Sequence, residues 1–230
     1  HLSRDHPRES VFSDSVNSSR SERTIVPTAV VKIGGSVLSM PDLSSRLSRL
    51  LQKFQHEDVL CVIGGGAATD VVREWDRRHQ LGDEAAHWLA IESLGLTARL
   101  VRHLIPGSTL VRTRAEAAVC WEDHRVAIAD VPACLQTLAS ESCTDLPHSW
   151  DATSDSISAW LATLWPADRL VLVKSIDPPG SLEELAARGA VDAVFLSLAA
   201  KLPQILWCNL AANCEVTPVP ACTVSQDLST

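Results

Sequence analysis

The chain has 230 residues, of which 46% are hydrophobic and 21% are charged, and its formal net charge is −8. This composition is typical of a globular protein that can bury a sizeable core in one domain or in two tightly joined lobes. The negative charge argues against nucleic acid or an anionic membrane as the main partner, so any bound phosphate must be held by local cations and backbone N–H groups.

The cysteines and the first residues of the chain indicate a cytoplasmic protein. The seven cysteines include no C-x-x-C pair, which favours reduced thiols over a disulfide framework or a structural zinc site. We find no run of about 18 apolar residues that predicts a membrane span. Residues 1–28 are rich in serine and in charges of both signs and lack an apolar signal region. We therefore expect a flexible tail over residues 1–28 and one domain over residues 29–230.

From residue 29 onward, short apolar runs alternate with stretches of helical periodicity. The runs are rich in β-branched residues, and the first two stop at glycines. We predict strands over residues 29–33, 59–63, 117–119, 126–129, 170–174 and 205–208. We predict helices from Asp42 to Phe54, after Gly66, and over residues 84–103, 154–164, 182–187 and 193–202. In the helix after Gly66, we expect Val71, Val72 and Trp75 to face the core.

This alternation predicts an α/β fold, a three-layer α/β/α sandwich around a mostly parallel sheet. Ligands of such folds bind beyond the carboxyl ends of the strands. Three segments lie just past predicted strand ends, at residues 32–36, 64–67 and 174–177. We therefore expect the functional site to form there.

Two of these strand ends carry glycine clusters, KIGGS at residues 32–36 and IGGG at residues 63–66. Glycine lets the backbone approach a phosphate closely, and the N–H groups of a strand-to-helix turn form a cradle for anions. Lys32 can add a positive charge beside a transferring phosphoryl group. Neither cluster matches the Walker A or G-x-G-x-x-G pattern. The alternative is that the glycines only make tight turns. Two clusters on successive strands, with a lysine beside one of them, argue against this alternative.

The segment VVKIGGSVL, followed by VIGGG about 30 residues later, resembles the opening pattern of the amino acid kinase superfamily. That superfamily includes acetylglutamate, carbamate, uridylate and isopentenyl phosphate kinases. The resemblance covers residues 29–207 and implies the carbamate kinase-like fold with Lys32 as a catalytic residue. It implies that phosphoryl oxygens are held by Gly34, Gly35 and Ser36. It implies that the acceptor side is lined by Gly64, Gly65 and Gly66.

A second distinctive segment is HSWDATSDS at residues 148–156. Thr153 or Ser154 can cap the helix that follows, which explains one hydroxyl but not the two aspartates. Members of the superfamily carry an N-x-x-x-D or D-x-x-x-D element here, and its second acid organises the catalytic lysines. Asp155 matches that acid, and Asp151 matches the position four residues before it. The resemblance therefore implies that Asp155 is catalytic and that Asp151 lies on the acceptor side.

The form H-S-W-x-x-T-S-D-S looks like a narrower branch of the superfamily. This branch phosphorylates an aminomethylfuranyl-methyl phosphate in methanofuran biosynthesis. By this resemblance, the acceptor pocket is shaped by His148, Ser149 and Trp150. The alternative is that His148 and Trp150 are packing residues near a loop.

On the nucleotide side, the resemblance implies ATP contacts for Lys174, Ser175 and Asp177. The alternative for Lys174 is a simple charge at a strand end. Relatives continue with a D-G pattern, whereas residues 178–180 of this chain are Pro-Pro-Gly, so the adenine-side hairpin is shortened. The second phosphate-binding lysine of many relatives has no clean match, and Lys201 is the nearest candidate.

Taken together, the resemblance predicts a kinase that uses ATP and Mg²⁺ to phosphorylate a small anionic acceptor, with the aminomethylfuranyl-methyl phosphate favoured. A phosphate monoester is already anionic near neutral pH, so the transfer needs no general base, and we assign no side chain as a metal ligand. Two alternatives stay open. One is a kinase for UMP, another monophosphate or a carboxylate, and the other is a non-catalytic nucleotide- or ligand-binding protein. Relatives are commonly dimers or hexamers, so we expect a homo-oligomer, a dimer or larger.

Overall fold

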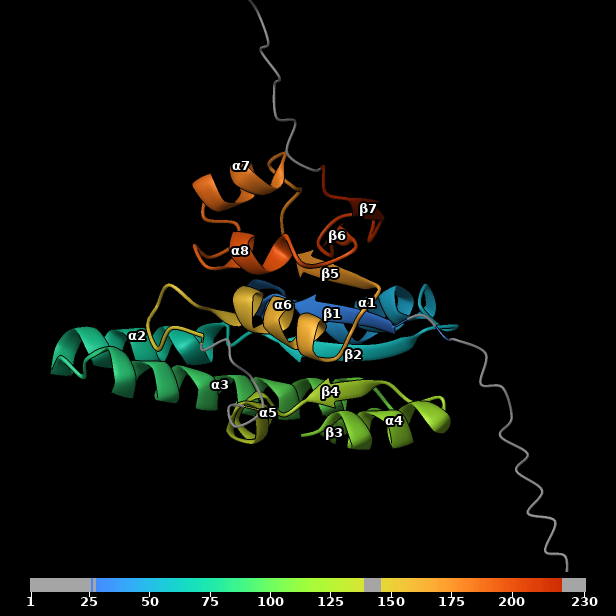
Figure 1. The fold of residues 1–230 in the computed structure, drawn as a ribbon, viewed down its shortest axis with the longest axis horizontal. Coiled ribbons are helices and arrows are strands. Elements are labelled where there is room, and N and C mark those ends of the chain that lie inside the picture. Colours follow the sequence, from blue (N-terminus) through green and yellow to red (C-terminus); the bar gives the residue numbers. More distant parts are fainter. Residues whose placement is uncertain (1–25, 27, 139–145, 221–230) are drawn as a thin grey trace, which may run out of the picture.

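The computed structural model describes residues 26, 28–138 and 146–220, so most of the predicted tail lies outside the described residues. Its centre is a seven-stranded sheet with the order β3-β4-β2-β1-β5-β6-β7 (Figure 1). Neighbouring strands pair in parallel, except for the antiparallel pair β6 and β7. The strands are β1 (Thr28–Ile33), β2 (Asp58–Ile63), β3 (Thr109–Val111), β4 (Ala127–Ala129), β5 (Arg169–Lys174), β6 (Ile205–Asn209) and β7 (Val216–Pro218).

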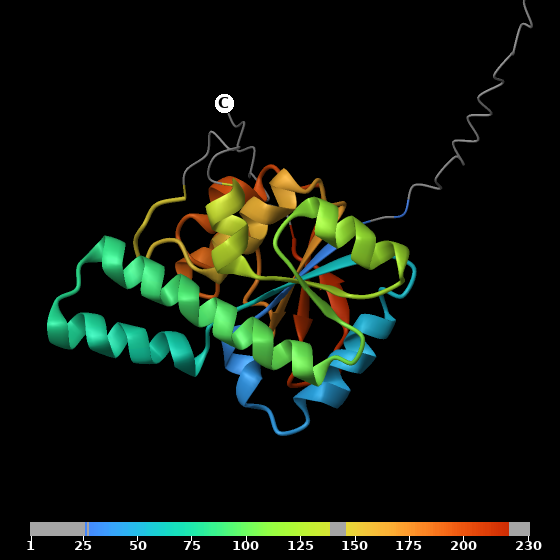
Figure 2. The same cartoon turned by 90° about the horizontal axis from the view of Figure 1, so that it is seen from below.

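Helices cover both faces of this sheet (Figures 1 and 2). They are the 3₁₀ helix η1 (Gly35–Ser39) and the α-helices α1 (Leu43–Gln52), α2 (Ala67–His79), α3 (Asp83–Leu104), α4 (Arg114–Glu122), α5 (Val131–Leu138), α6 (Ser154–Leu164), α7 (Leu182–Ala187) and α8 (Phe195–Ala199). The predicted three-layer α/β/α sandwich with a mostly parallel sheet is confirmed. In the part of the chain that the structure describes, none of the helices has both the length and the apolar character that crossing a membrane requires.

Alternate side chains of the strands point to opposite faces of the sheet and build two hydrophobic clusters. On one face, Val30 and Leu60 belong to a cluster with residues of α5, α6 and α8. On the other face, Val31 and Cys61 belong to a cluster with residues of α1. Because both faces are covered, the carboxyl ends of the strands are the surface on which a ligand site can form.

Most of the predicted strands and helices occur in the structure within three residues of the expected ends. The strand predicted over residues 117–119 is wrong, because these residues lie in α4. Thr113 caps that helix by accepting a hydrogen bond from the Glu116 N–H, and the Glu116 carboxylate accepts one from the Arg112 N–H at 2.8 Å. These local hydrogen bonds favour a helix more strongly than a run of three apolar residues favours a strand. Three short elements, β3, α5 and β7, were not predicted from the sequence.

The expected inward face of α2 is also partly wrong. Val72 is buried, but Val71 is 46% exposed and Trp75 is 48% exposed. Figure 2 shows the reason, because α2 and the first half of α3 form a hairpin that projects beyond the sheet. A helix in such a hairpin packs mainly against its partner helix, so one stripe of apolar residues is covered and the rest meets solvent.

The turns after β1 and β2 meet through their backbones. A Cβ atom on Gly35 would lie 2.3 Å from the Gly66 nitrogen, and one on Gly66 would lie 2.7 Å from the Gly35 oxygen. Gly66 also has a φ of +53°, in the left-handed region that glycine adopts easily. The presence of glycine at these two positions is therefore explained without a ligand, because glycine lets the turns after β1 and β2 approach each other closely.

The substitution Gly35→Ala should destabilise the fold, because the added methyl group would collide with backbone that cannot swing away. We expect the free energy of unfolding to fall by at least about 2 kcal/mol, measured by urea denaturation. The matched control is Ser39→Ala at an exposed position of the same turn, which should stay within about 0.5 kcal/mol of the native protein. Equal stability of the two variants would contradict the close contact of the turns.

Candidate active site

Asp155 joins two lysines at the carboxyl edge of the sheet. Its Oδ1 lies 2.7 Å from the Lys32 Nζ, and its Oδ2 lies 2.8 Å from the Lys174 Nζ. Lys32 belongs to β1 and Lys174 ends the neighbouring parallel strand β5, so the sheet itself brings the two ammonium groups together. The side chains of Lys32 and Asp155 are almost fully buried, and that of Lys174 is mostly buried.

The charges of this cluster, which we call the Lys-Asp-Lys cluster, depend on one another. Burial alone would raise the pKa of the Asp155 carboxyl, but the ammonium groups of Lys32 and Lys174 outweigh it and hold that pKa below its ordinary value. Burial and the nearby Lys32 ammonium lower the pKa of Lys174 to about 8, in spite of its ion pair with Asp155. With both lysines protonated, two positive charges face one negative charge. The excess positive charge makes this edge of the sheet attractive to an anion.

Asp192 fixes the start of α6, the helix that carries Asp155. Its Oδ2 accepts hydrogen bonds from the Thr153 N–H at 3.0 Å, the Thr153 hydroxyl at 2.8 Å and the Ser156 N–H at 3.0 Å. Its Oδ1 accepts from the Ser156 hydroxyl and, at 3.0 Å, from the Phe195 N–H. One carboxylate thus ties the first turn of α6 to the first turn of α8. A carboxylate at a helix N-terminus also interacts favourably with the helix dipole.

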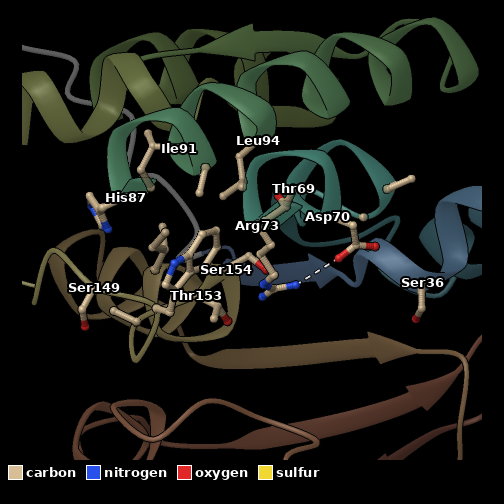
Figure 3. Close-up of a pocket in the computed structure, with 18 of the residues that line it drawn as sticks. Ser36, Thr69, Asp70, Arg73, His87, Ile91, Leu94, Ser149, Thr153 and Ser154 are labelled. Atoms are coloured by element: carbon tan, nitrogen blue, oxygen red, sulfur yellow. Dashed lines mark hydrogen bonds and ion pairs between the residues drawn. The ribbon is translucent and has the colours of Figure 1, made fainter. Parts of the chain in front are cut away.

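Beside the Lys-Asp-Lys cluster lies a cavity of about 410 Å³, which we call the acceptor-side cavity. Its walls come from α2, α3, the turns after β1 and β2, and the segment over residues 149–157 (Figure 3). Ile91, Leu94 and Ile157 give it an apolar wall, and Arg73 and Asp70 give it one side chain of each charge. It therefore suits a small molecule that has both a charged group and an apolar body.

The predicted acceptor-side residues divide into two groups. Ser149, Trp150, Gly65 and Gly66 line the acceptor-side cavity. Gly64 is buried in the adjoining turn, where its N–H donates to the Ile33 carbonyl at 2.8 Å and an added Cβ would lie 2.8 Å from the Gly35 nitrogen.

Neither His148 nor Asp151 is part of the cavity lining. His148 stacks on His87, with ring centroids 4.7 Å apart, and pairs with Glu84 at 2.7 Å. His87 does line the cavity, and burial together with His148 lowers the pKa of His87, so its ring is neutral near neutral pH. Asp151 is exposed, and its N–H donates to the Ser149 hydroxyl at 3.2 Å. These two residues brace the loop from outside, so their contact with an acceptor stays a prediction.

The residues predicted for the phosphates and the nucleotide are divided. Gly35 and Ser36 line the acceptor-side cavity, whereas Gly34, Lys174, Ser175 and Asp177 are not part of its lining. The Ser36 and Ser175 hydroxyls are 2.9 Å apart, which joins the ends of β1 and β5. Gly34 is buried there, and its N–H donates to the Val173 carbonyl at 2.8 Å. Asp177 accepts a hydrogen bond from the Asn209 Nδ2 at 2.9 Å.

Of Lys174 and Lys201, the structure places only Lys174 beside Asp155. Lys201, the nearest candidate by pattern, is exposed after the end of α8. Lys174 instead shares Asp155 with Lys32 and also donates to the Ala190 carbonyl at 2.7 Å. The sequence pattern favoured a nucleotide contact or a strand-end charge for Lys174, and its ion pair with Asp155 was not predicted. The pairing of β1 with β5, which creates that ion pair, leaves no local signal in the sequence.

Comparisons with known proteins agree on one family. A family model described as the amino acid kinase family matches residues 27–178. The "[5-(aminomethyl)furan-3-yl]methyl phosphate kinase" of Methanocaldococcus jannaschii is 25% identical over 151 residues, which cover 64% of this chain. The aligned part is 66% of that kinase, just under two thirds of its length.

Solved structures of two UMP kinases share the fold. The enzyme from Ureaplasma parvum superposes with a TM-score of 0.56 at 14% identity, covering 80% of this chain and 89% of that one. The uridylate kinase from Archaeoglobus fulgidus gives a TM-score of 0.56 at 16% identity, covering 84% of this chain and 90% of that one.

Replacing Asp192 by alanine should destabilise the first turns of α6 and α8 together, because several donors lose their shared acceptor. We expect the free energy of unfolding to fall by roughly 2–4 kcal/mol, measured by urea denaturation. Asp151→Ala is the matched control, since Asp151 is an exposed aspartate just before α6, and it should change stability by about 0.5 kcal/mol or less. An Asp192→Ala variant as stable as this control would show that the bonds to Asp192 contribute little.

Proposed function

The chain belongs to the amino acid kinase family, and from this premise we propose that it is a phosphotransferase that transfers the γ-phosphoryl group of ATP to a small phosphate monoester. The favoured acceptor is an aminomethylfuranyl-methyl phosphate, which would become the diphosphate. The observation that carries the proposal is the Lys-Asp-Lys cluster, which places excess positive charge at the sheet edge beside the acceptor-side cavity.

The proposed reaction needs charge screening more than proton transfer. An oxygen of the acceptor phosphate attacks the γ-phosphorus of ATP, and the bond from that phosphorus to the β–γ bridging oxygen breaks, which releases ADP. A phosphate monoester has its second pKa near about 6, so its attacking oxygen carries no proton at neutral pH. The protein must instead hold two polyanions together and offset their repulsion. Lys32 and Lys174 are placed to do this, and Asp155 holds both ammonium groups in position.

In this proposal the nucleotide occupies the side of Lys174, Ser175 and Asp177, and the turn with Gly34, Gly35 and Ser36 lies between donor and acceptor. Both oxygens of Asp155 are engaged by lysines, which argues against a direct metal bond from this carboxylate. Across residues 28–138 and 146–220, no three His, Cys, Asp or Glu side chains gather as a metal-binding group. We propose that Mg²⁺ is held by phosphate oxygens of ATP, where it would neutralise part of their charge.

The acceptor is the least constrained part of the proposal. The name of the related kinase from M. jannaschii supports the furanyl compound. The UMP kinases support UMP as the second candidate, because they share the fold. A non-catalytic binding protein is the remaining alternative, and it would bind ATP without turning over any acceptor. The predictions of a cytoplasmic location and of a dimer or larger homo-oligomer are part of the proposal.

The test of the proposal is ATP consumption with Mg²⁺ against the aminomethylfuranyl-methyl phosphate, UMP, isopentenyl phosphate, acetylglutamate and carbamate. We expect turnover of the furanyl compound. Lys32→Ala should lower kcat by about 10²–10³-fold or more, because the variant loses a positive charge that acts on the transferring group. The fold should persist, since Asp155 keeps its ion pair with Lys174.

Lys53→Ala, at an exposed lysine after α1, is the matched control and should retain native turnover. Near-native turnover by the Lys32→Ala variant would refute the proposed role of Lys32. Turnover of another acceptor alone would keep the kinase and discard the furanyl compound.

The affinity for ATP should depend on pH through Lys174. Its ammonium attracts phosphate below a pKa of about 8, and a bound anion would raise that pKa, so affinity is lost as the pH rises past about 8. We expect the dissociation constant of a non-hydrolysable ATP analogue to rise roughly tenfold between about pH 7 and pH 9.5, measured by calorimetry. The Lys174→Arg variant keeps its charge over this range and should show a flat profile. A dissociation constant of the native protein that does not change with pH would contradict the assignment of Lys174 as an ATP contact.

A further inference from the structure

Arg73 brings a cationic group into the acceptor-side cavity. It lies on α2, lines the cavity, and places its guanidinium carbon 4.9 Å from the centroid of the Trp150 ring. A guanidinium over an indole at this distance makes a cation–π contact, which holds the planar group by its face. The edge of the guanidinium, which carries the N–H donors, stays available for a ligand.

A second contact fixes the indole itself. The Trp150 Nε1–H donates a hydrogen bond to Asp76 Oδ2 at 2.9 Å, across 74 positions of the sequence. Asp76 lies three residues after Arg73 on α2, so the two side chains project from neighbouring positions of one helix. The helix therefore holds the guanidinium directly and, through Asp76, holds the ring on which the guanidinium rests.

The other partner of Arg73 is easily replaced. Its Nη1 lies 3.0 Å from Asp70 Oδ1, but the two side chains are 52% and 70% exposed (Figure 3). An ion pair this exposed to water contributes little free energy. A phosphate group offers two oxygens to the guanidinium fork, in a geometry that strengthens the contact. A phosphate that enters the cavity can therefore compete with Asp70 for Arg73.

The rest of the cavity matches a compact anion with a small uncharged body. Gly65 and Gly66 lead into α2, whose N-terminal end is the positive pole of the helix dipole and favours negative charge. The apolar wall of Ile91, Leu94 and Ile157 adjoins this region. A free alcohol would bring no anion to the guanidinium or to this end of the helix.

We propose that Arg73 binds the phosphate of the acceptor, and that Trp150 and Asp76 are positioning residues that hold Arg73 in place. The site would thereby select phosphate monoesters with a small, largely apolar body over the corresponding alcohols. This inference rests on the proposed function, because it concerns the acceptor of that reaction.

The kinetic test compares Arg73→Met with the matched control Arg77→Met, an exposed arginine one turn later on α2. We expect Arg73→Met to raise the KM for the aminomethylfuranyl-methyl phosphate about 10- to 100-fold, with the KM for ATP changed less than about twofold. Asp76→Leu should raise the acceptor KM by a smaller factor, and Asp76→Asn, which keeps an oxygen acceptor, should restore it. An acceptor KM for Arg73→Met equal to that of Arg77→Met would overturn the proposal. A preference for acetylglutamate that depends on Arg73 would overturn the proposal that the acceptor is a phosphate monoester.

A binding test works even if the native enzyme turns over none of these acceptors. The indole N–H signal of Trp150 is assigned by its loss in the Trp150→Phe variant, in protein labelled with ¹⁵N. Benzyl phosphate should shift this signal in the native protein and in Arg77→Met, but not in Arg73→Met. Benzyl alcohol should not shift it. This pattern without turnover would refute the proposed function and support Arg73 as a phosphate ligand, whereas equal shifts with phosphate and alcohol would overturn the inference.

Discussion

The ion pairs of Asp155 are the interaction on which the site depends. Two ammonium groups at the edge of one sheet repel each other, and burial makes that repulsion stronger because little water screens it. The carboxylate of Asp155 lies between them and turns an unfavourable pair into a stable group with excess positive charge. Two other features of the structure serve this arrangement. The sheet sets the separation of the lysines, and Asp192 sets the position of the helix that delivers the carboxylate.

The contact between Gly35 and Gly66 gives the site a second constraint. Since the two turns touch through backbone atoms, the acceptor-side turn after β2 cannot shift without displacing the turn after β1. A change of shape on ligand binding must then come from the flanking walls. Those walls are the projecting hairpin of α2 and α3 and the loop that carries Trp150, which are joined by the hydrogen bond between Trp150 and Asp76.

The sequence predicted what short-range patterns encode. The glycine turns, the strand lysine and the helix that begins near Asp155 were all visible as local motifs, and the alternation of strands and helices was enough to predict the sandwich. The faces of α2 were misjudged because a projecting hairpin has no sheet on its second side. Asp192 was missed because its partners Thr153 and Ser156 lie more than 30 positions away and meet it only in the folded chain. The same holds for Arg73, whose contact with Trp150 depends on how the loop folds back over α2.

The lowered pKa of Lys174 has a consequence for the chemical reactivity of the protein. An amine with a pKa of about 8 is unprotonated in about a tenth of the molecules at pH 7, whereas an ordinary lysine is so in fewer than about one in a thousand. Only the unprotonated amine is a nucleophile. An acylating reagent that carries a phosphate group should therefore react with Lys174 more readily than with a lysine of ordinary pKa. The electrostatic balance that suits the site to anions thus also makes Lys174 a position for covalent labelling.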